Sequence, residues 1–546
     1  MKKYPKTSIL ILSVVLLYLL LLIPIEHDIH ILKVNANPFS WSQDSVWKSL
    51  ELKFIRANEF GCEKIKFTVD SLLASSAILL NEVSTNTIDP SNEKFTTLES
   101  NIFNIAPLIP VCAQYFSDYI NFYSELRKVV KQQSIHWDMN STEAKNTLYR
   151  LLYGNRIAIE EIMLQLPENK VATLIKGVDE PSSAPSAEIL GVKIHSGDIL
   201  VSRGGAPTSA LIARGNDYPG NFSHIALVHI DEKTNLISII ESHIERGVTV
   251  SSLEEYLNDK KLRIMVLRLK SELISDNPIL PHLAAEFSLS EAKQKHIPYD
   301  FEMNIAESER QFCSEVASSA YKEFGITIWT GLSTISSKGI RNWLAAFGVK
   351  YFETQEPSDL EYDPQISVVA EWRDTETLYK DHLDNAVTDV MLEEADSGKI
   401  LTHDWYALPI GRVMKLYSAI LNIFGKEGPI PEGMSAEAAL KNVSYSETHD
   451  QIRARLTVLA NQSKDEKGYT PPYWELVNLA RQALNEVNKK IFLIEFLKRF
   501  IFFFSFERYL NCKAGAGVIP SCHSGWAYCI YSSVVSFYNS FYYRKT

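Results

Sequence analysis

Hydrophobic residues change their spacing near residue 187, and this change limits the chain to a mixed fold. Before it, apolar residues recur at helical intervals of three and four; after it come short runs rich in β-branched residues. Four such runs are predicted to be strands: residues 198–202, 223–230, 236–240 and 263–268. The sequence therefore predicts an α+β domain with an antiparallel sheet, flanked by helical regions.

Composition divides the rest of the chain into further segments. A chain of 546 residues is expected to form several domains. A Pro- and Ser-rich stretch over residues 180–187 is a predicted linker, and residues 203–221 read as a loop. The predicted segments are a membrane or signal segment (1–36), a helical bundle (37–180), the mixed domain (186–372), a helical C-terminal region (373–508) and a tail of unknown structure (509–546).

The N-terminal segment 1–36 has the pattern of a membrane or export signal. Three lysines precede an uncharged apolar run over residues 8–25, whose 18 residues approach the ~20 needed to cross a bilayer. A signal anchor, which is a transmembrane helix, is favoured over a signal peptide cleaved after Ala36 and over a buried core helix. The basic flank predicts a single-pass membrane protein with the domains that follow outside the cytoplasm, in the periplasm or cell envelope.

The overall charge restricts the classes of partner. The net charge is −11, which argues against a nucleic-acid partner because phosphate binding needs clustered Lys and Arg. A second membrane contact is open at the Phe-rich stretch 491–506, which fits a membrane-surface helix or a core helix equally well.

Cysteines are consistent with an exported chain, in which disulfides can form. Cys62 with Cys112 is one possible pair, and the three cysteines of the tail can supply another, but spacing does not fix the connectivity. No CxxC motif is present, so a zinc ribbon or a thioredoxin-type centre has no support. The six cysteines are Cys62, Cys112, Cys313, Cys512, Cys522 and Cys529.

A predicted hairpin places three titratable side chains near one another. If Asp231 pairs with Leu236, His224 lies opposite His243, and Glu241 lies one diagonal step away on the same face. A shift of one residue in the register would remove both candidate partners from that face. The hairpin thus supplies a base and an orienting group, although a strand histidine is more often structural than catalytic.

Cys313 stands at the start of a predicted helix that extends to Phe324. The positive end of a helix dipole favours the thiolate, which is the form that attacks an acyl carbon. The alternative is an inert cysteine buried at a helix start. The buried stripe of this helix is predicted to be Val316, Ala317, Ala320, Tyr321 and Phe324.

Five short motifs follow one another in the order seen in a known family. The chain resembles the YaeF/YiiX-like cysteine hydrolases, the circularly permuted branch of the NlpC/p60 papain-like superfamily, in which histidine precedes cysteine. The resemblance covers residues 186–372 and implies a permuted papain-like α+β fold with a helix that begins at the cysteine. The motifs are Gly197–Leu200, Phe222–Val228, Ile240–Ser242, Pro298–Asp300 and Phe312–Val316.

The resemblance implies a triad of Cys313 as nucleophile, His224 as general base and Glu241 as the group that orients the imidazole. His243 competes with Glu241 for the orienting role. The expected reaction is cleavage of an amide bond through a thioester, without a cofactor or a metal. The backbone N–H of the nucleophile is the expected oxyanion donor. The substrate-binding candidates are Ser223, Tyr299 and Asp300, of which the last two alternatively form only a turn.

Other functions stay open for the same residues. The expected substrate is a peptide, a peptidoglycan-derived peptide or an acylated small molecule, but acyl transfer or lipid-ester cleavage would use the same triad. A non-catalytic papain-like binding module is a further alternative. A zinc site from His224, His229, His243 and Glu241 is disfavoured, because His224 and His229 point to opposite faces of their strand.

Overall fold

A computed structural model describes residues 5–23, 36–41 and 44–490 of the chain. Backbone contacts divide the chain into two compact units, residues 1–484 and 485–546. The features below belong to the first unit. The Phe-rich stretch 491–506, the predicted tail and its three cysteines lie outside the described residues.

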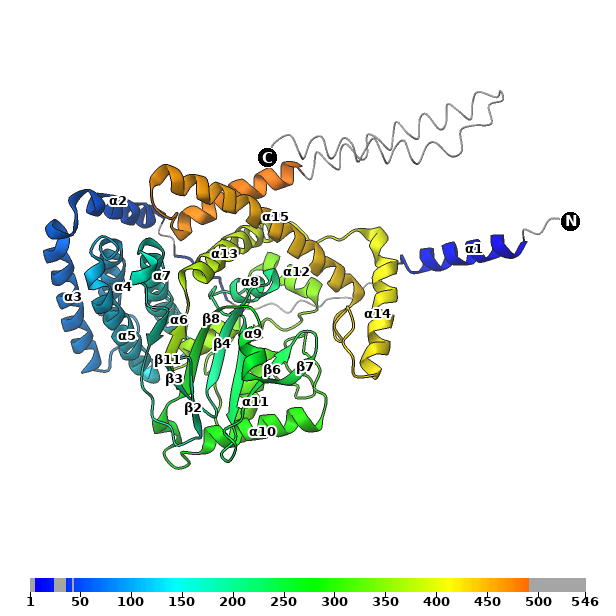
Figure 1. Ribbon diagram of the computed structural model, residues 1–546, viewed down its shortest axis with the longest axis horizontal. Helices are drawn as coiled ribbons and strands as arrows, with labels where there is room; N and C mark the ends of the chain where they lie inside the picture. Colours follow the sequence, from blue (N-terminus) through cyan, green and yellow to red (C-terminus); the bar gives the residue numbers. More distant parts are fainter. Residues whose placement is uncertain (1–4, 24–35, 42–43, 491–546) are drawn as a thin grey trace, which may run out of the picture. The chain divides into compact units, whose positions relative to one another are not determined.

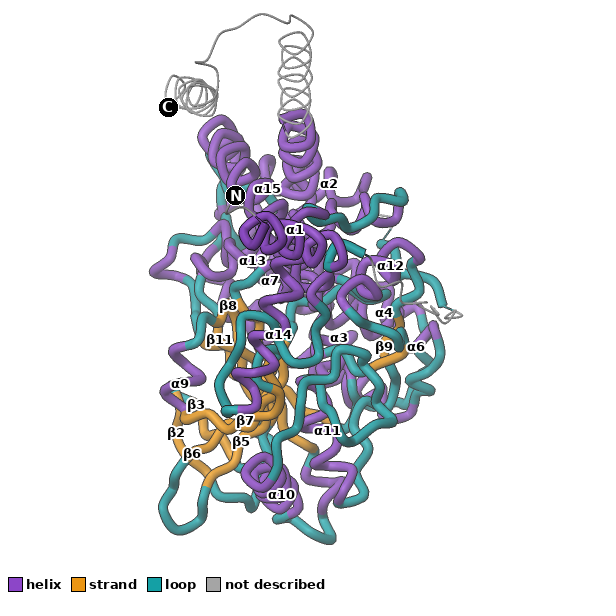
Figure 2. The backbone as a smooth tube through the Cα atoms, turned by 90° about the vertical axis from the view of Figure 1, so that its right-hand side faces the viewer, coloured by secondary structure: helices purple, strands orange, loops and turns teal. Residues whose placement is uncertain are grey.

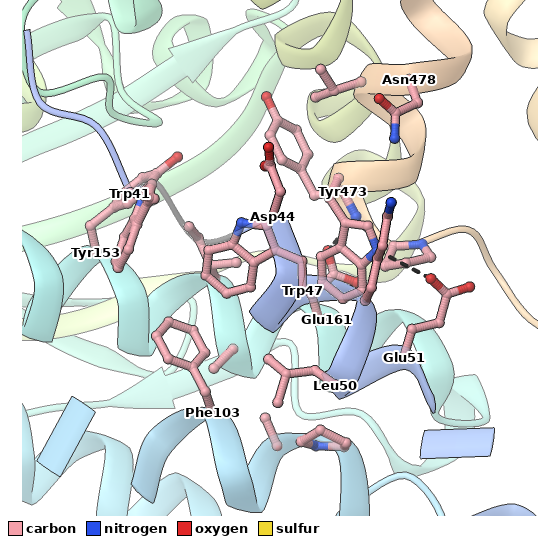
Figure 3. Close-up of a pocket in the computed structure, with 18 of the residues that line it drawn as sticks. Trp41, Asp44, Trp47, Leu50, Glu51, Phe103, Tyr153, Glu161, Tyr473 and Asn478 are labelled. Atoms are coloured by element: carbon pink, nitrogen blue, oxygen red, sulfur yellow. Dashed lines mark hydrogen bonds between the residues drawn. The ribbon is translucent and has the colours of Figure 1, made fainter. Parts of the chain in front are cut away.

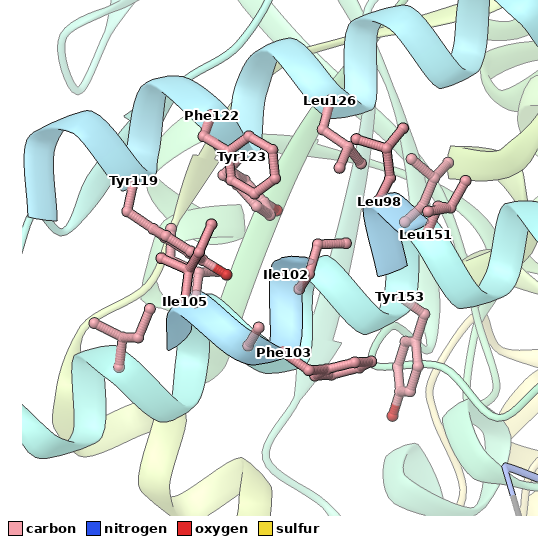
Figure 4. Packing of buried hydrophobic residues seen from close by; sticks show 14 of the residues in the cluster. Leu98, Ile102, Phe103, Ile105, Tyr119, Phe122, Tyr123, Leu126, Leu151 and Tyr153 are labelled. Atoms are coloured by element: carbon pink, nitrogen blue, oxygen red, sulfur yellow. The ribbon is translucent and has the colours of Figure 1, made fainter. Parts of the chain in front are cut away.

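The N-terminal region is helical and has its own hydrophobic core. Amphipathic helices turn their apolar faces inward, and the core is fully closed around Leu98, Ile102 and Tyr119 (Figure 4). Cys62 and Cys112, one of the pairings that the sequence leaves open, form a disulfide that joins the start of α3 to the loop before α5. The helices are α2 (Asp44–Phe60), α3 (Cys62–Ser84), α4 (Glu93–Ile105), α5 (Phe116–Gln133), α6 (Thr142–Leu148) and α7 (Gly154–Gln165).

A seven-stranded antiparallel sheet forms the centre of the mixed domain (Figure 1). Its order is β1-β11-β8-β4-β5-β6-β7, and the four strands predicted from the sequence are β4, β5, β6 and β8. The bounds are β1 (Leu174–Lys176), β4 (Ile199–Gly204), β5 (His224–Ile230), β6 (Ile237–His243), β7 (Gly247–Ser252), β8 (Lys261–Leu269) and β11 (Ile366–Trp372).

The first strand of this sheet comes from a segment that the sequence assigns to the helical bundle. Ile175 of β1 pairs with Glu371 of β11, so the sheet begins before the predicted linker. Two small antiparallel strand pairs complete the strands described here. They are β2 (Ser186–Ile189) with β3 (Val192–His195), and β9 (Ser333–Thr334) with β10 (Glu353–Thr354).

Alternate residues of the strands face two separate cores. Ile225 and Leu227 of β5 pack with helices α10 and α11 on one face, whereas Ala226 and Val228 contribute to the core of the other face. Figure 2 shows α10 and α11 beside the strands. The helices of this domain are α8 (Pro207–Arg214), α9 (Leu253–Asn258), α10 (Leu280–Gln294), α11 (Cys313–Glu323) and α12 (Lys338–Phe347).

The predicted loop over residues 203–221 is wrong in its middle. Helix α8 occupies Pro207–Arg214, because proline is well tolerated in the first turn of a helix and the following Ala210, Leu211 and Ala213 are buried in the core. Arg214 is buried at the end of α8 and pairs with Asp389, so it is not a solvated loop residue.

Helices follow the sheet, as the sequence predicts. Helix α13 is largely buried and contacts α7, α8, α12, α15 and strand β8. After α15 a further helix begins at residue 473. The bounds are α13 (Thr375–Asp396), α14 (Leu408–Ile423) and α15 (Ala436–Lys467).

A buried cluster of charges ties the N-terminal helices to the sheet. Glu160 of α7 accepts hydrogen bonds from Arg263 of β8, from Arg373 just after β11 and from His382 of α13. All four side chains are buried, and each carries a partner of opposite charge or a hydrogen bond, which such groups need away from water. The helical region and the mixed domain therefore share a polar interior.

The N-terminal helix is shorter than the predicted transmembrane segment. Helix α1 covers Pro5–Leu20, which is 16 residues, and the apolar run beyond it leaves the helix at residues 21–23. Within residues 5–490, less the two gaps, no helix is both long and apolar enough to span a bilayer.

Candidate active site

The register of the β5–β6 hairpin is the one predicted from its turn. Ala226 pairs with Glu241 and Ile230 with Ile237, and the Asp231 N–H donates to the Leu236 carbonyl. The turn is stabilised by the Asp231 carboxylate, which accepts hydrogen bonds from the next turn residues. This register brings Glu241 to the same face as the histidine that opens β5.

Two histidines share the Glu241 carboxylate. His224 Nε2 lies 2.8 Å from Glu241 Oε2, and His243 Nε2 lies 3.2 Å from Glu241 Oε1. Ser251 Oγ donates to Oε1 at 2.9 Å, and only 2 % of the carboxylate side chain is exposed. The structure thus brings together two of the three residues that the resemblance assigns to the triad, together with the competing histidine.

Burial and these bonds shift the pKa values in opposite senses. Burial lowers the pKa of His224, although the Glu241 carboxylate partly offsets the shift. Burial alone would raise the pKa of Glu241, but its hydrogen bonds to the two histidines hold the pKa well below the usual range. At neutral pH the pair is therefore a neutral imidazole beside an ionised carboxylate.

Cys313 is the first residue of α11, whose start is fixed by neighbouring polar groups. Glu315 Oε2 accepts the Phe312 N–H at 2.9 Å, which satisfies a donor at the helix start. Ser242 Oγ donates to the Gln311 carbonyl at 2.7 Å and so holds the preceding residues against β6. These contacts set the position of the thiol relative to the hairpin.

The thiol lies against the strand residues that flank His224. Cys313 Sγ is 3.9 Å from the carbonyl oxygen of Ser223, and the backbone N–H of Ile225 interacts with the sulfur. The polar contacts of the thiol in this region are thus with the backbone on either side of the histidine rather than with its imidazole. The structure brings the sulfur to the end of β5, where β5 and β6 are no longer paired.

Burial of the thiol opposes the activation that its position at a helix start predicts. Burial raises the pKa of Cys313 to about 12, and only 4 % of the residue is exposed. A helix dipole contributes about 0.3–1 kcal/mol, which is less than the cost of desolvating a thiolate that this pKa implies. Activation therefore requires a base that removes the proton during the reaction.

The predicted substrate-binding residues occupy three different environments. The Tyr299 side chain is partly exposed, and burial, followed by the nearby Cys313 thiol, raises its pKa. Asp300 is buried and accepts the backbone N–H groups of Glu302 and Asn304, which is the turn-forming arrangement that the sequence left open. Ser223 lies beside the sulfur, and its buried hydroxyl has no hydrogen-bond partner in the part of the chain described.

One acidic residue near the thiol has no counterpart in the sequence predictions. Glu356 is buried close enough to Cys313 and Tyr299 to affect the pKa of both groups. Burial, followed by the nearby Asp359, raises the pKa of Glu356 to about 8, so this side chain is mostly protonated at neutral pH. It comes from a loop 43 residues beyond the cysteine, where no local pattern points to a site.

The three side chains of the hairpin are also spaced closely enough to hold a metal ion. One ligand atom each from His224, Glu241 and His243 lie within 4.8 Å of one another. Two imidazoles and a carboxylate are a donor set that zinc accepts. The fourth residue considered from the sequence, His229, faces the other side of the sheet and stacks on His282 at 5.3 Å.

The family comparison agrees with the mixed helix and antiparallel-sheet architecture. Residues 193–370 match the family model of the permuted papain-like amidase enzymes, YaeF/YiiX, C92 family. This segment contains His224, Glu241 and Cys313. No curated protein is similar enough to the chain to count as a match. The resemblance predicted from the motifs is confirmed over residues 193–370, which are similar to the permuted papain-like amidases, a family of cysteine peptidase and amidase enzymes.

Proposed function

We propose that this chain is a cysteine hydrolase that cleaves amide bonds with a triad of Cys313, His224 and Glu241. The observation that carries the proposal is the 2.8 Å bond between His224 Nε2 and Glu241 Oε2, at the end of the strand against which the thiol lies. The bond commits Nε2 to the carboxylate. Nδ1 is then the ring nitrogen that remains to take a proton from sulfur.

The proposed reaction begins from a neutral thiol and a neutral imidazole. His224 removes the proton as the sulfur of Cys313 attacks the substrate carbonyl, and Glu241 stabilises the imidazolium that forms. The tetrahedral intermediate loses the amine, which takes the proton from the imidazolium and leaves a thioester. Water, deprotonated by the same imidazole, then releases the acid. The free N–H groups at the start of α11 are the proposed donors to the oxyanion.

Two apolar helices favour lipid esters as a second candidate substrate. Large apolar side chains of α14 recur on one exposed face at helical spacing, next to Trp405 and Tyr406. Tyr18 of α1 donates to the Tyr406 carbonyl at 2.8 Å, so the apolar α1 lies beside this face. The exposed residues of α14 are Ile410, Val413, Leu416, Tyr417, Ile420 and Ile423.

This surface supports the proposal that the protein works at a membrane, with α1 and α14 in contact with lipid. A location outside the cytoplasm, in the periplasm or cell envelope, is supported by the Cys62–Cys112 disulfide, since such bonds persist in oxidising compartments. A hydrolase in this position reaches either cell-wall peptides or lipid headgroups. An acyl transferase would form the same thioester and would differ from the hydrolase only in passing the acyl group to an alcohol or amine instead of water.

The deciding experiment compares the full chain with its Cys313→Ala variant on two substrate panels. Peptidoglycan-derived peptides and simple acyl-amides report release of free amine, and lipid esters in vesicles report release of free acid. Amine release by the native chain alone supports the amidase. Acid release alone favours the lipid-ester hydrolase. If the native chain cleaves neither panel, the non-catalytic binding module is the remaining interpretation. Equal cleavage by the Cys313→Ala variant contradicts both proposed enzymes.

A further inference from the structure

A cavity away from the thiol is built by segments far apart in the sequence. Its volume is about 560 Å³, within the size range of small-ligand sites. Side chains of α2, α4, α7 and the helix that begins at residue 473 line it (Figure 3). None of the lining residues belongs to the hairpin or to α11.

Aromatic rings make up much of the cavity wall. The rings of Trp47 and Trp474 are nearly parallel, with centroids 6.0 Å apart and an interplanar angle of 12°. Phe103 meets Trp47 edge-on at 5.2 Å, and Tyr153 stacks on Tyr149 at 4.6 Å. Aromatic faces carry partial negative charge, so a wall of this kind attracts cations.

Most charged groups of the lining are already neutralised in pairs. Asp389 forms a two-point ion pair with Arg214, with distances of 2.8 and 2.9 Å. Arg481 is bound by the Glu393 carboxylate in the same manner, with distances of 2.8 and 2.7 Å. These pairs leave neither arginine to attract an anion.

Other charges of the lining lie at its rim. Glu51 accepts hydrogen bonds from Lys467 at 3.0 Å and from the indole of Trp474 at 3.2 Å. Asp44 and Lys48, on the exposed edge, carry one charge of each sign.

Glu161 is the exception among the carboxylates. It projects from α7 into the lining, and it accepts the backbone N–H of Tyr473 at 2.8 Å. In the described part of the chain no Lys or Arg forms an ion pair with it, and the nearby His382 is bonded to Glu160 instead. Burial raises the pKa of Glu161, since an ionised carboxylate here lacks a compensating charge.

We infer that this cavity binds a small organic cation, an alkylammonium group held by the aromatic wall and the Glu161 carboxylate. The aromatic rings attract the positive charge, and the bound cation supplies the counter-ion that the protein does not provide to Glu161. A quaternary or primary ammonium carried on a larger molecule fits the volume. The proposal is independent of the hydrolase assignment, because it uses none of the triad residues.

The test measures binding of choline to the full chain by isothermal titration calorimetry. The matched probe is 3,3-dimethylbutan-1-ol, which has the same shape without the charge. We expect choline to bind with one site per chain and the neutral alcohol to bind about tenfold more weakly. Glu161→Gln and Trp474→Phe should each weaken choline binding about fivefold or more. Trp405→Phe, which changes an exposed tryptophan outside the cavity, should leave it unchanged.

Thermal unfolding of each variant identifies any that fails to fold, and Glu161→Gln, which keeps the shape of the side chain, decides the result if Trp474→Phe does not fold. Equal affinity for choline and the neutral alcohol would overturn the inference. No saturable binding of choline by the native chain, or native affinity in Glu161→Gln, would also overturn it.

Discussion

The imidazole of His224 is held by the Glu241 carboxylate through Nε2, with 2.8 Å between the two atoms. The carboxylate is itself held by Ser251 Oγ at 2.9 Å and by His243 at 3.2 Å. This arrangement fixes the orientation of the ring before any substrate arrives. It also separates the role of Glu241, which positions the ring, from that of the ring, which moves the proton.

Glu241→Gln should lower kcat about 10- to 100-fold, because an amide can still accept the Nε2–H bond but no longer stabilises the imidazolium. His243→Gln should have a smaller effect, since this residue bonds to the carboxylate and only packs beside the catalytic ring. The measurement is steady-state turnover of the substrate that the two-panel comparison identifies, with the exposed Glu188→Gln as the control. Native turnover in Glu241→Gln combined with a large loss in His243→Gln would transfer the positioning role to His243.

The fall of kcat/KM at acid pH should follow the protonation of His224. Its imidazole must be neutral to act as a base, and burial lowers its pKa from the usual value, so kcat/KM should fall only below about pH 6.5. Glu241 raises this pKa by stabilising the charged ring, so Glu241→Gln should move this fall to lower pH. A fall that moves to higher pH in this variant would contradict the assignment.

Alkylation of Cys313 should be slow at neutral pH, and its rate should keep rising as the pH increases beyond 9. Burial raises the pKa of this thiol to about 12, so little thiolate exists in the free protein near pH 7. The measurement follows the peptide that contains Cys313 by mass spectrometry after timed exposure to iodoacetamide, with a short unstructured cysteine peptide as the reference. A rate that levels off below pH 8 would contradict this prediction, because it would show that Cys313 is already a thiolate, as its position at a helix start predicts.

Glu160→Gln should destabilise the fold by about 3–5 kcal/mol, because it leaves the buried Arg263 and Arg373 without their carboxylate. Glu125→Gln, in an exposed pair with Lys128, should cost less than about 0.5 kcal/mol. Urea unfolding followed by circular dichroism gives both values. Similar losses in the two variants would show that the buried cluster does not hold the helices to the sheet.

Local sequence patterns were sufficient to predict the β5–β6 hairpin and its register. The Asp231 turn determines the register, and the alternation of side chains then places Glu241 beside His224, so the sequence contains this part of the site. The start of α11 is equally local, because Phe312 and Glu315 make their contacts within one helical turn. These features were therefore predictable without tertiary information.

Features that depend on distant contacts were not predictable. Strand β1 has three residues and is a strand only because β11 offers it an edge. The pKa of Cys313 depends on how completely the surrounding elements exclude water, which no local pattern records. Glu356 reaches the thiol from a loop, and Glu160 finds its partners in three other elements. The short α1 likewise shows that an apolar run does not by itself fix the length of a helix.

The most direct test of the mechanism is to trap the acyl-enzyme. The native chain and its Cys313→Ala variant are mixed with a slowly hydrolysed 4-nitrophenyl ester, quenched in acid within one turnover, and digested for mass spectrometry. The account predicts an acyl group on the peptide that contains Cys313 in the native chain, little of it in His224→Ala, and none in Cys313→Ala. An acyl group on a different residue, or turnover without any acylated peptide, would contradict it.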